Sequence, residues 1–131
     1  MAFVPMTAGG GGSMTETTLW TNSSPSASFA AQTITLSDNI SNYDYIRIKY
    51  RYNNTTPTDS YAMTDVTSLQ SMTGTGTMTL ALGLQHTNGI NYARNCLYVS
   101  DTELKFTLAW YGNNSTSALV SIPGEIIGVK L

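Results

Sequence analysis

Few side chains in this sequence could perform acid–base, nucleophilic or metal chemistry. His86 is the only histidine and Cys96 is the only cysteine. A catalytic nucleophile needs a base and an orienting group beside it, and no spacing here suggests such a set. One cysteine allows neither an internal disulfide nor a cysteine-based zinc site. The sequence therefore predicts a protein that is not an enzyme, with no catalytic residues, no metal and no cofactor, and with His86 in a structural or surface role.

Single aspartates are spread through turn-like stretches, where they commonly accept hydrogen bonds from the backbone that follows. The loop flanked by Asp38 and Asp44 offers oxygen ligands for calcium, but it lacks the regular alternation of acidic residues seen in calcium loops. We therefore expect turn-forming aspartates at five places: Asp38, Asp44, Asp59, Asp65 and Asp101.

Three basic residues could instead form a binding surface. Arg47, Lys49 and Arg51 alternate with apolar residues, and they are half of the 6 basic residues in the chain. On a β-strand this spacing places them on one face. Such a face is either a solvated outer surface or a candidate interface that pairs with an acidic neighbour.

A second candidate surface is the aromatic segment that begins at Trp110. Aromatic rings beside asparagine amides can stack on sugars and hydrogen-bond to them. This predicts a candidate glycan-binding loop formed by Trp110, Tyr111, Asn113 and Asn114. Trp110 also keeps the alternation of the apolar residues before it, so we expect its ring to be buried, which counts against the sugar site.

The first 13 residues differ from the rest of the chain. An apolar segment, Phe3, Val4, Pro5 and Met6, is followed by four consecutive glycines, Gly9, Gly10, Gly11 and Gly12. Glycine runs of this kind behave as flexible linkers. We expect an anchoring arm with a glycine hinge over residues 1–13 and a folded domain over residues 14–131. A disordered tail is the alternative interpretation.

From residue 17 onward the apolar residues recur with a period of two, which is typical of half-buried strands. The pair Asn88-Gly89 is the strongest hairpin signal. No segment predicts an amphipathic helix, and at most a turn is expected at 41–43. We expect an all-β, antiparallel β-sandwich, jelly-roll-like, with a Greek-key barrel as the alternative. About eight strands are predicted, at 18–22, 29–36, 45–52, 61–69, 78–86, 90–99, 103–110 and 119–130.

The composition narrows the possible partners. Charged residues make up 11% of the chain, the net charge is −2 and the pI is about 5.0. A weakly acidic protein does not bind nucleic acid through phosphate contacts. No apolar run is long enough to insert into a membrane, and the start lacks the features of a signal peptide, so synthesis in a cytoplasm is expected. Polar surfaces of low charge favour subunit packing, because interface cores are depleted in charge.

Several stretches resemble small structural proteins of tailed bacteriophages, which occur as head-fibre, decoration or tail-appendage proteins. The resemblance covers most of residues 15–131. It is carried by Thr15-Glu-Thr-Thr-Leu-Trp-Thr-Asn-Ser-Ser-Pro-Ser-Ala-Ser-Phe-Ala-Ala-Gln-Thr-Ile-Thr-Leu-Ser, by Ile40-Ser-Asn-Tyr-Asp-Tyr-Ile-Arg-Ile and by Ile126-Ile-Gly-Val-Lys-Leu131. It implies a β-sandwich component of the virion, made in the host bacterial cytoplasm. Such proteins are often homotrimers held to the particle by an N-terminal segment. The resemblance transfers no site residues.

These observations favour a virion structural protein that contacts other capsid or tail proteins and forms a homo-oligomer, with a trimer favoured. Long tail fibres carry a shaft that this chain lacks, so a short knob or decoration subunit is expected. The second hypothesis is a receptor- or glycan-binding module of a tail fibre, with a host-surface glycan as its ligand. A small hydrolase on a β scaffold is the third, and no substrate suggests itself.

Overall fold

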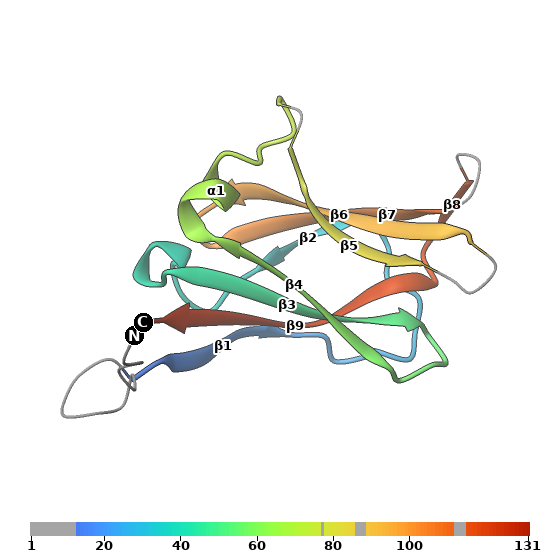
Figure 1. Ribbon diagram of the computed structural model, residues 1–131, viewed down its shortest axis with the longest axis horizontal. Coiled ribbons are helices and arrows are strands. Elements are labelled where there is room, and N and C mark those ends of the chain that lie inside the picture. Colours follow the sequence, from blue (N-terminus) through green and yellow to red (C-terminus); the bar gives the residue numbers. More distant parts are fainter. Residues whose placement is uncertain (1–12, 77, 86–88, 112–114) are drawn as a thin grey trace, which may run out of the picture.

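The computed structural model describes residues 13–76, 78–85, 89–111 and 115–131. Two antiparallel sheets pack face to face as a β-sandwich (Figure 1). This confirms the predicted fold class, with nine strands among the described residues where about eight were expected. The four-stranded sheet has the order β1 (Thr15–Thr21), β9 (Val120–Lys130), β3 (Tyr45–Asn53), β4 (Asp59–Asp65). The five-stranded sheet has the order β2 (Gln32–Thr35), β7 (Glu103–Tyr111), β6 (Asn91–Ser100), β5 (Leu80–Gln85), and β8 (Ser115–Ser117) also pairs with β7.

The chain passes repeatedly from one sheet to the other. It crosses between β1 and β2, between β2 and β3, between β4 and β5, and between β8 and β9. The β3–β4 hairpin and the β5–β6–β7 meander each stay within one sheet. The crossings wrap both sheets around one core in the jelly-roll-like manner expected from the sequence.

The core lies between the two sheets and follows the predicted alternation. Ile46 and Ile48 of β3 are fully buried and face Leu104 and Phe106 of β7 across the sandwich. The ring of Phe106 packs edge-to-face against Phe29, with centroids 5.6 Å apart. Each such side chain contributes about 1.5–3 kcal/mol by leaving water. The two rows of apolar residues therefore hold the sheets together.

The predicted strand over 61–69 is wrong beyond Asp65. There β4 ends and a short helix, α1 (Val66–Gln70), begins. The carboxylate of Asp65 accepts a hydrogen bond from the backbone N–H of Ser68 at 2.9 Å, which caps the helix. The hydrogen bond from the Ser68 hydroxyl, together with this backbone bond, lowers the pKa of Asp65. The helix directs both Val66 and Leu69 into the core. A strand would bury only every second residue and could not place both of them there.

Two shorter elements also differ from the expectation. The turn expected at 41–43 is a 3-10 helix, η1 (Ile40–Asn42), and the carboxylate of Asp38 holds it by accepting hydrogen bonds from Asn42 and from the Tyr43 hydroxyl. β8 was not predicted, because three residues of the type Ser-Thr-Ser carry no periodicity. The β5–β6 hairpin is confirmed, with Gln85 opposite Asn91 and Gly89 at a φ of +87°. His86 and Asn88 lie outside the described residues.

A β-bulge in β7 reverses the direction of its side chains. Arg94 of β6 lies opposite Ala109, and Cys96 lies opposite Phe106, so β7 takes three steps where β6 takes two. Phe106 and Ala109 are both fully buried, and Trp110 is therefore turned outward, with 47% of its surface exposed. The expectation that Trp110 is buried is wrong for this reason.

Arg94 is fully buried within the sandwich. Its guanidinium donates hydrogen bonds of 2.7–3.1 Å to four backbone carbonyls, those of Phe29, Thr107, Val120 and Ser121. Its Cζ also lies 5.2 Å from the centroid of the Phe29 ring. Burial lowers the pKa of Arg94 to about 10. One side chain thus joins β6 to β7, to β9 and to the segment before β2.

Candidate functional site

The outer face of β3 carries the three basic residues predicted to share a strand face. Arg47 forms an ion pair with Glu16 of β1 at 2.7 Å, and a second nitrogen of its guanidinium lies 3.3 Å from the other carboxylate oxygen. Lys49 lies 3.9 Å from the carboxylate of Glu125 on β9. The hydrogen bond from Arg47 lowers the pKa of Glu16. These cations are thus already matched by carboxylates of the same sheet.

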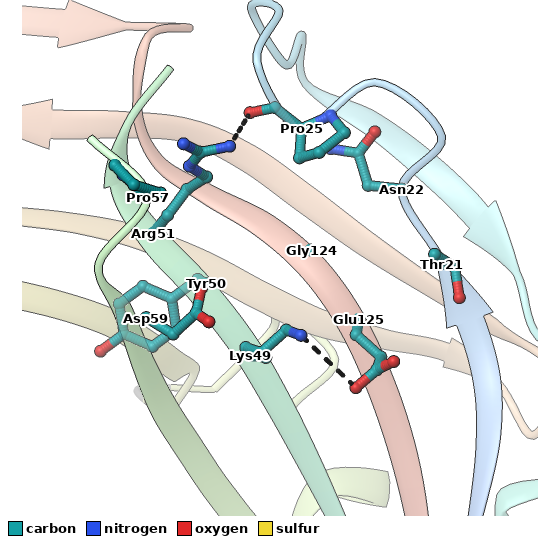
Figure 2. Close-up of a pocket in the computed structure, with 10 residues that line it drawn as sticks. All are labelled: Thr21, Asn22, Pro25, Lys49, Tyr50, Arg51, Pro57, Asp59, Gly124 and Glu125. Carbon is teal, nitrogen blue, oxygen red and sulfur yellow. Dashed lines mark hydrogen bonds and ion pairs between the residues drawn. The ribbon is translucent and has the colours of Figure 1, made fainter. Parts of the chain in front are cut away.

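Arg51 lies in a pocket at one end of this face (Figure 2). Its guanidinium donates hydrogen bonds to the backbone carbonyls of Thr56 at 3.1 Å and Pro25 at 3.3 Å. These bonds tie β3 to the loops on either side of the pocket. Gly124 also lines the pocket, where β9 has one more residue than β3 between the pairs Lys49–Glu125 and Tyr50–Pro123. The cavity has a volume of about 300 Å³.

Charges of both signs line this pocket. Figure 2 shows Lys49 directed toward Glu125 on one side, with Arg51 and Asp59 on neighbouring strands. Its described lining contains no histidine and no cysteine. A pocket of this kind can hold a small polar group or a loop of another subunit. It offers no activated nucleophile.

An exposed apolar pair continues this face onto the edge strand β4. Tyr61 is 59% exposed and Met63 is 58% exposed. The Cζ of Arg47 lies 5.8 Å from the centroid of the Tyr61 ring. Met63 lies opposite Arg47 in the pairing of β3 with β4. The basic strand face is therefore bordered by apolar contact area.

Trp110 and Tyr111 of the predicted sugar-binding loop point in opposite directions. Tyr111 stacks on Tyr92, with ring centroids 5.7 Å apart, and Tyr92 packs edge-to-face on Tyr52 of β3 at 5.6 Å. These three tyrosines fill the space between the sheets at one end of the sandwich. Trp110 is exposed on the outer face of the five-stranded sheet. Asn113 and Asn114 lie outside the described residues.

The residues around Trp110 form an uncharged row across the five-stranded sheet. Gly83, Ala93, Trp110 and Thr116 lie directly opposite one another across four adjacent strands, β5, β6, β7 and β8. We name this row, together with the amides beside it, the neutral face. The amides belong to Gln85, Asn91 and Asn95, which lie two residues along β5 and β6 from the row.

The anchoring arm predicted from the sequence also lies outside the described residues, with its apolar segment Phe3, Val4, Pro5 and Met6 and its hinge Gly9, Gly10, Gly11 and Gly12. The described part of the chain begins at Ser13, and the strands begin at Thr15, which pairs with Lys130. The described chain thus starts at an edge strand of the four-stranded sheet.

Metal and thiol chemistry find no support in the described residues. Across 13–76, 78–85, 89–111 and 115–131, no three His, Cys, Asp or Glu side chains gather to hold a metal ion. Cys96 is buried, and burial raises the pKa of its thiol to about 12, so it is not a reactive nucleophile. Neither helix in this part of the chain is long and apolar enough to cross a bilayer.

Comparison with known proteins adds no family. No protein-family model matches the chain, and no curated protein has a sequence that matches it.

Sequence reasoning missed two features of these surfaces. Arg94 could have been found, because it stands at an inward position of β6 two residues before the buried Cys96. The row through Gly83, Ala93 and Trp110 could not, because it depends on the registers of four strands and on the bulge in β7.

Proposed function

We propose that this chain is a non-enzymatic structural protein of a bacteriophage virion, a head-fibre, decoration or tail-appendage subunit. It docks to the particle through its N-terminal arm and self-associates through its β-sandwich. A homotrimer is the favoured assembly, and capsid or tail proteins are its partners. The protein is made in the host bacterial cytoplasm and ends in the virion.

One observation carries this proposal. Both sheets are built from residues 15–130, and β1 begins just after the four glycines. In the sequence, four glycines thus separate the apolar residues Phe3, Val4 and Met6 from β1, and glycine runs are the usual composition of a tether between two binding parts. The fold and the low charge also support a packed virion subunit.

Self-association is supported by apolar side chains on the outer face of the four-stranded sheet. Tyr61 is 59% exposed and Met63 is 58% exposed there. Aromatic residues and methionine are enriched at subunit interfaces, and charged residues are depleted from their cores. The carboxylates of Glu16 and Glu125 already offset Arg47 and Lys49, which reduces the cost of burying this face.

The experiment that tests this proposal compares the full chain with a variant lacking residues 1–13. Both are supplied in trans to a phage whose own copy of the gene is deleted, and purified particles are analysed by mass spectrometry. We expect incorporation to be lost in the truncated variant, while its circular dichroism spectrum and urea midpoint stay those of the full chain. Light scattering on the same two proteins gives the mass of each oligomer. We expect both proteins to form oligomers with the same number of subunits.

A matched variant separates the arm's apolar residues from its length. Replacing Phe3, Val4 and Met6 by serine keeps the length and the glycine hinge, and we expect it to abolish incorporation as truncation does. Normal incorporation of either variant would refute anchoring by the arm. An oligomer that forms only in the full chain would mean that the arm joins the subunits to one another.

A receptor- or glycan-binding module of a tail fibre is the second candidate function. The observation that favours it is the outward position of Trp110, since an exposed tryptophan on a strand offers a ring for stacking. Loss of phage adsorption in a Trp110→Ala variant that still enters particles would support this function. Unchanged adsorption would count against it.

A further inference from the structure

The neutral face has small, uncharged side chains around one large ring. Gly83 has no side chain, Ala93 has one methyl group, and Thr116 is small, so Trp110 is the one large residue of the row. A Cβ added to Gly83 would meet only the carbonyl of Tyr92, at 3.9 Å. The surface beside the indole ring is therefore low and open.

Amide groups border this low surface. Gln85 and Asn91 lie opposite each other on one side of the row and are exposed. Asn95 lies on the other side, where its side-chain oxygen accepts a hydrogen bond from the Thr79 hydroxyl at 3.1 Å. Each amide provides both donors and an acceptor. None of the residues of the neutral face carries a charge.

We propose that the neutral face binds an uncharged polysaccharide. The indole of Trp110 stacks on the apolar face of one sugar ring, and the amides of Gln85, Asn91 and Asn95 exchange hydrogen bonds with its hydroxyl groups and those of the adjoining sugars. Four strands at the usual spacing span about 14 Å, which is long enough for a short run of sugars. The open surface over Gly83 and Ala93 lets the ligand lie flat along the sheet.

The chemistry of this face favours an uncharged sugar over other occupants. An anionic glycan would need basic residues, and the nearest one on β7, Lys105, lies opposite Leu97, four residues along β6 from Ala93. Trp110 is the one large apolar residue within the neutral face, and the exposed Val99 lies six residues along β6 from Ala93, whereas subunit interfaces are rich in large apolar residues. Amides around one exposed indole suit a ligand that is covered with hydroxyl groups and has one apolar face.

This inference rests on the second candidate function and names its ligand class, and it places the sugar on the strand face rather than on the loop that follows. It is independent of the arm. A failure of sugar binding leaves particle incorporation unchanged, and a failure of incorporation leaves sugar binding by the purified protein unchanged. The two results are read in separate experiments.

The test is affinity electrophoresis of the full chain in gels that contain dextran, mannan or galactan, with polygalacturonate as the anionic control. We expect at least one uncharged polymer to retard the protein, and Trp110→Ala to weaken that binding about tenfold or more. Tyr61→Ala is the matched control, since it removes an aromatic side chain with 59% exposure from the other sheet. We expect the control to bind as the wild-type protein does.

A spectroscopic measurement tests the stacking directly. Trp20 packs against Phe29 and Phe106, with ring centroids 6.0 Å and 6.1 Å away, so a Trp20→Phe variant leaves Trp110 as the only indole. We expect the polymer that retards the protein to shift the emission of Trp110 in this variant to shorter wavelength, because stacking on a sugar removes water from the indole.

The following results would overturn the proposal: no retardation by any uncharged polymer, a preference for polygalacturonate, or equal losses in Trp110→Ala and Tyr61→Ala. Oligomer mass gives a further check. A fall in mass in Trp110→Ala alone would mean that a second copy covers the neutral face, which would also overturn it.

Discussion

The two sheets of this sandwich place arginine in different surroundings. The four-stranded sheet carries Arg47, Lys49 and Arg51 on its outer face, and the first two are paired with carboxylates of neighbouring strands. The five-stranded sheet directs Arg94 into the core, where backbone carbonyls surround the guanidinium, and the outer face above it is neutral around Trp110. The four-stranded sheet thus presents paired charges along β3, whereas the five-stranded sheet presents amides and an indole around Trp110, with Lys105 farther along β7.

Only 11% of the residues are charged, and the arginines among them occupy two kinds of site, an ion pair on the outer face and a buried position in the core. On the outer face an ion pair is solvated and easily exchanged for another contact. In the core a guanidinium with several carbonyl partners is fixed in place, because removing it leaves buried acceptors without donors. Removal of Arg94 is therefore expected to cost the fold far more than removal of Arg47.

The largest effect is expected from Arg94→Ala. The substitution leaves four backbone carbonyls without their donor in a buried site. We expect the free energy of unfolding to fall by about 3 kcal/mol or more, measured by urea denaturation. Arg47→Ala is the matched control, since it removes the same side chain from the outer face. Equal losses in the two variants would contradict the comparison.

A smaller effect is expected from alanine at two glycines, one facing the core and one on the outer surface. A Cβ at Gly128 would lie 2.7 Å from atoms of the Tyr43 ring, whose hydroxyl is bonded to Asp38 at 2.8 Å. We expect Gly128→Ala to cost about 1–3 kcal/mol in thermal or urea unfolding, because the held ring must shift. Gly83→Ala on the neutral face should be neutral or slightly stabilising, by up to about 1 kcal/mol. A larger loss at Gly83 than at Gly128 would show that the neutral face is packed against something.

The smallest effect concerns the acid titration of the charged face. Because Arg47 lowers the pKa of Glu16, the folded chain holds this proton less tightly than the unfolded chain does. The pair therefore contributes stability above the unfolded pKa of about 4.3, and this contribution is lost as the pH falls below that value. Carboxyl titration by NMR should show the pKa of Glu16 rising toward its ordinary value in Arg47→Gln and staying lowered in Trp110→Ala. An unchanged pKa in Arg47→Gln would contradict the pairing.

The sequence predicted those parts of the fold that depend on neighbouring residues along the chain. The alternation over 45–52 gave both the buried Ile46 and Ile48 and the outward Arg47, as the structure has them. The predicted hairpin at Asn88-Gly89 also joins two paired strands. Local spacing is enough here, because a strand that is buried on one face repeats every second residue.

The parts that failed depend on contacts distant in sequence or on one local hydrogen bond. The bulge that turns Trp110 outward exists only in the pairing of β7 with β6, which no single strand records. The helix after Asp65 is started by the hydrogen bond from the Ser68 backbone N–H to the Asp65 carboxylate. The residues before it favour a strand, so the sequence predicted that the strand continues. The inward position of Arg94 follows from the alternation of β6, but its four carbonyl partners lie in three separate parts of the chain and could not be predicted from its neighbours.

The bulge in β7 also divides that strand into two halves in which opposite sets of alternating residues face the core. Before it, even-numbered residues such as Leu104 and Phe106 face inward, and after it Ala109 does. The phase of the second half is thus set by the count of residues between Phe106 and Ala109. An evolutionary deletion of one residue there would exchange the inner and outer residues of the following segment in a single step, and an insertion would do the same.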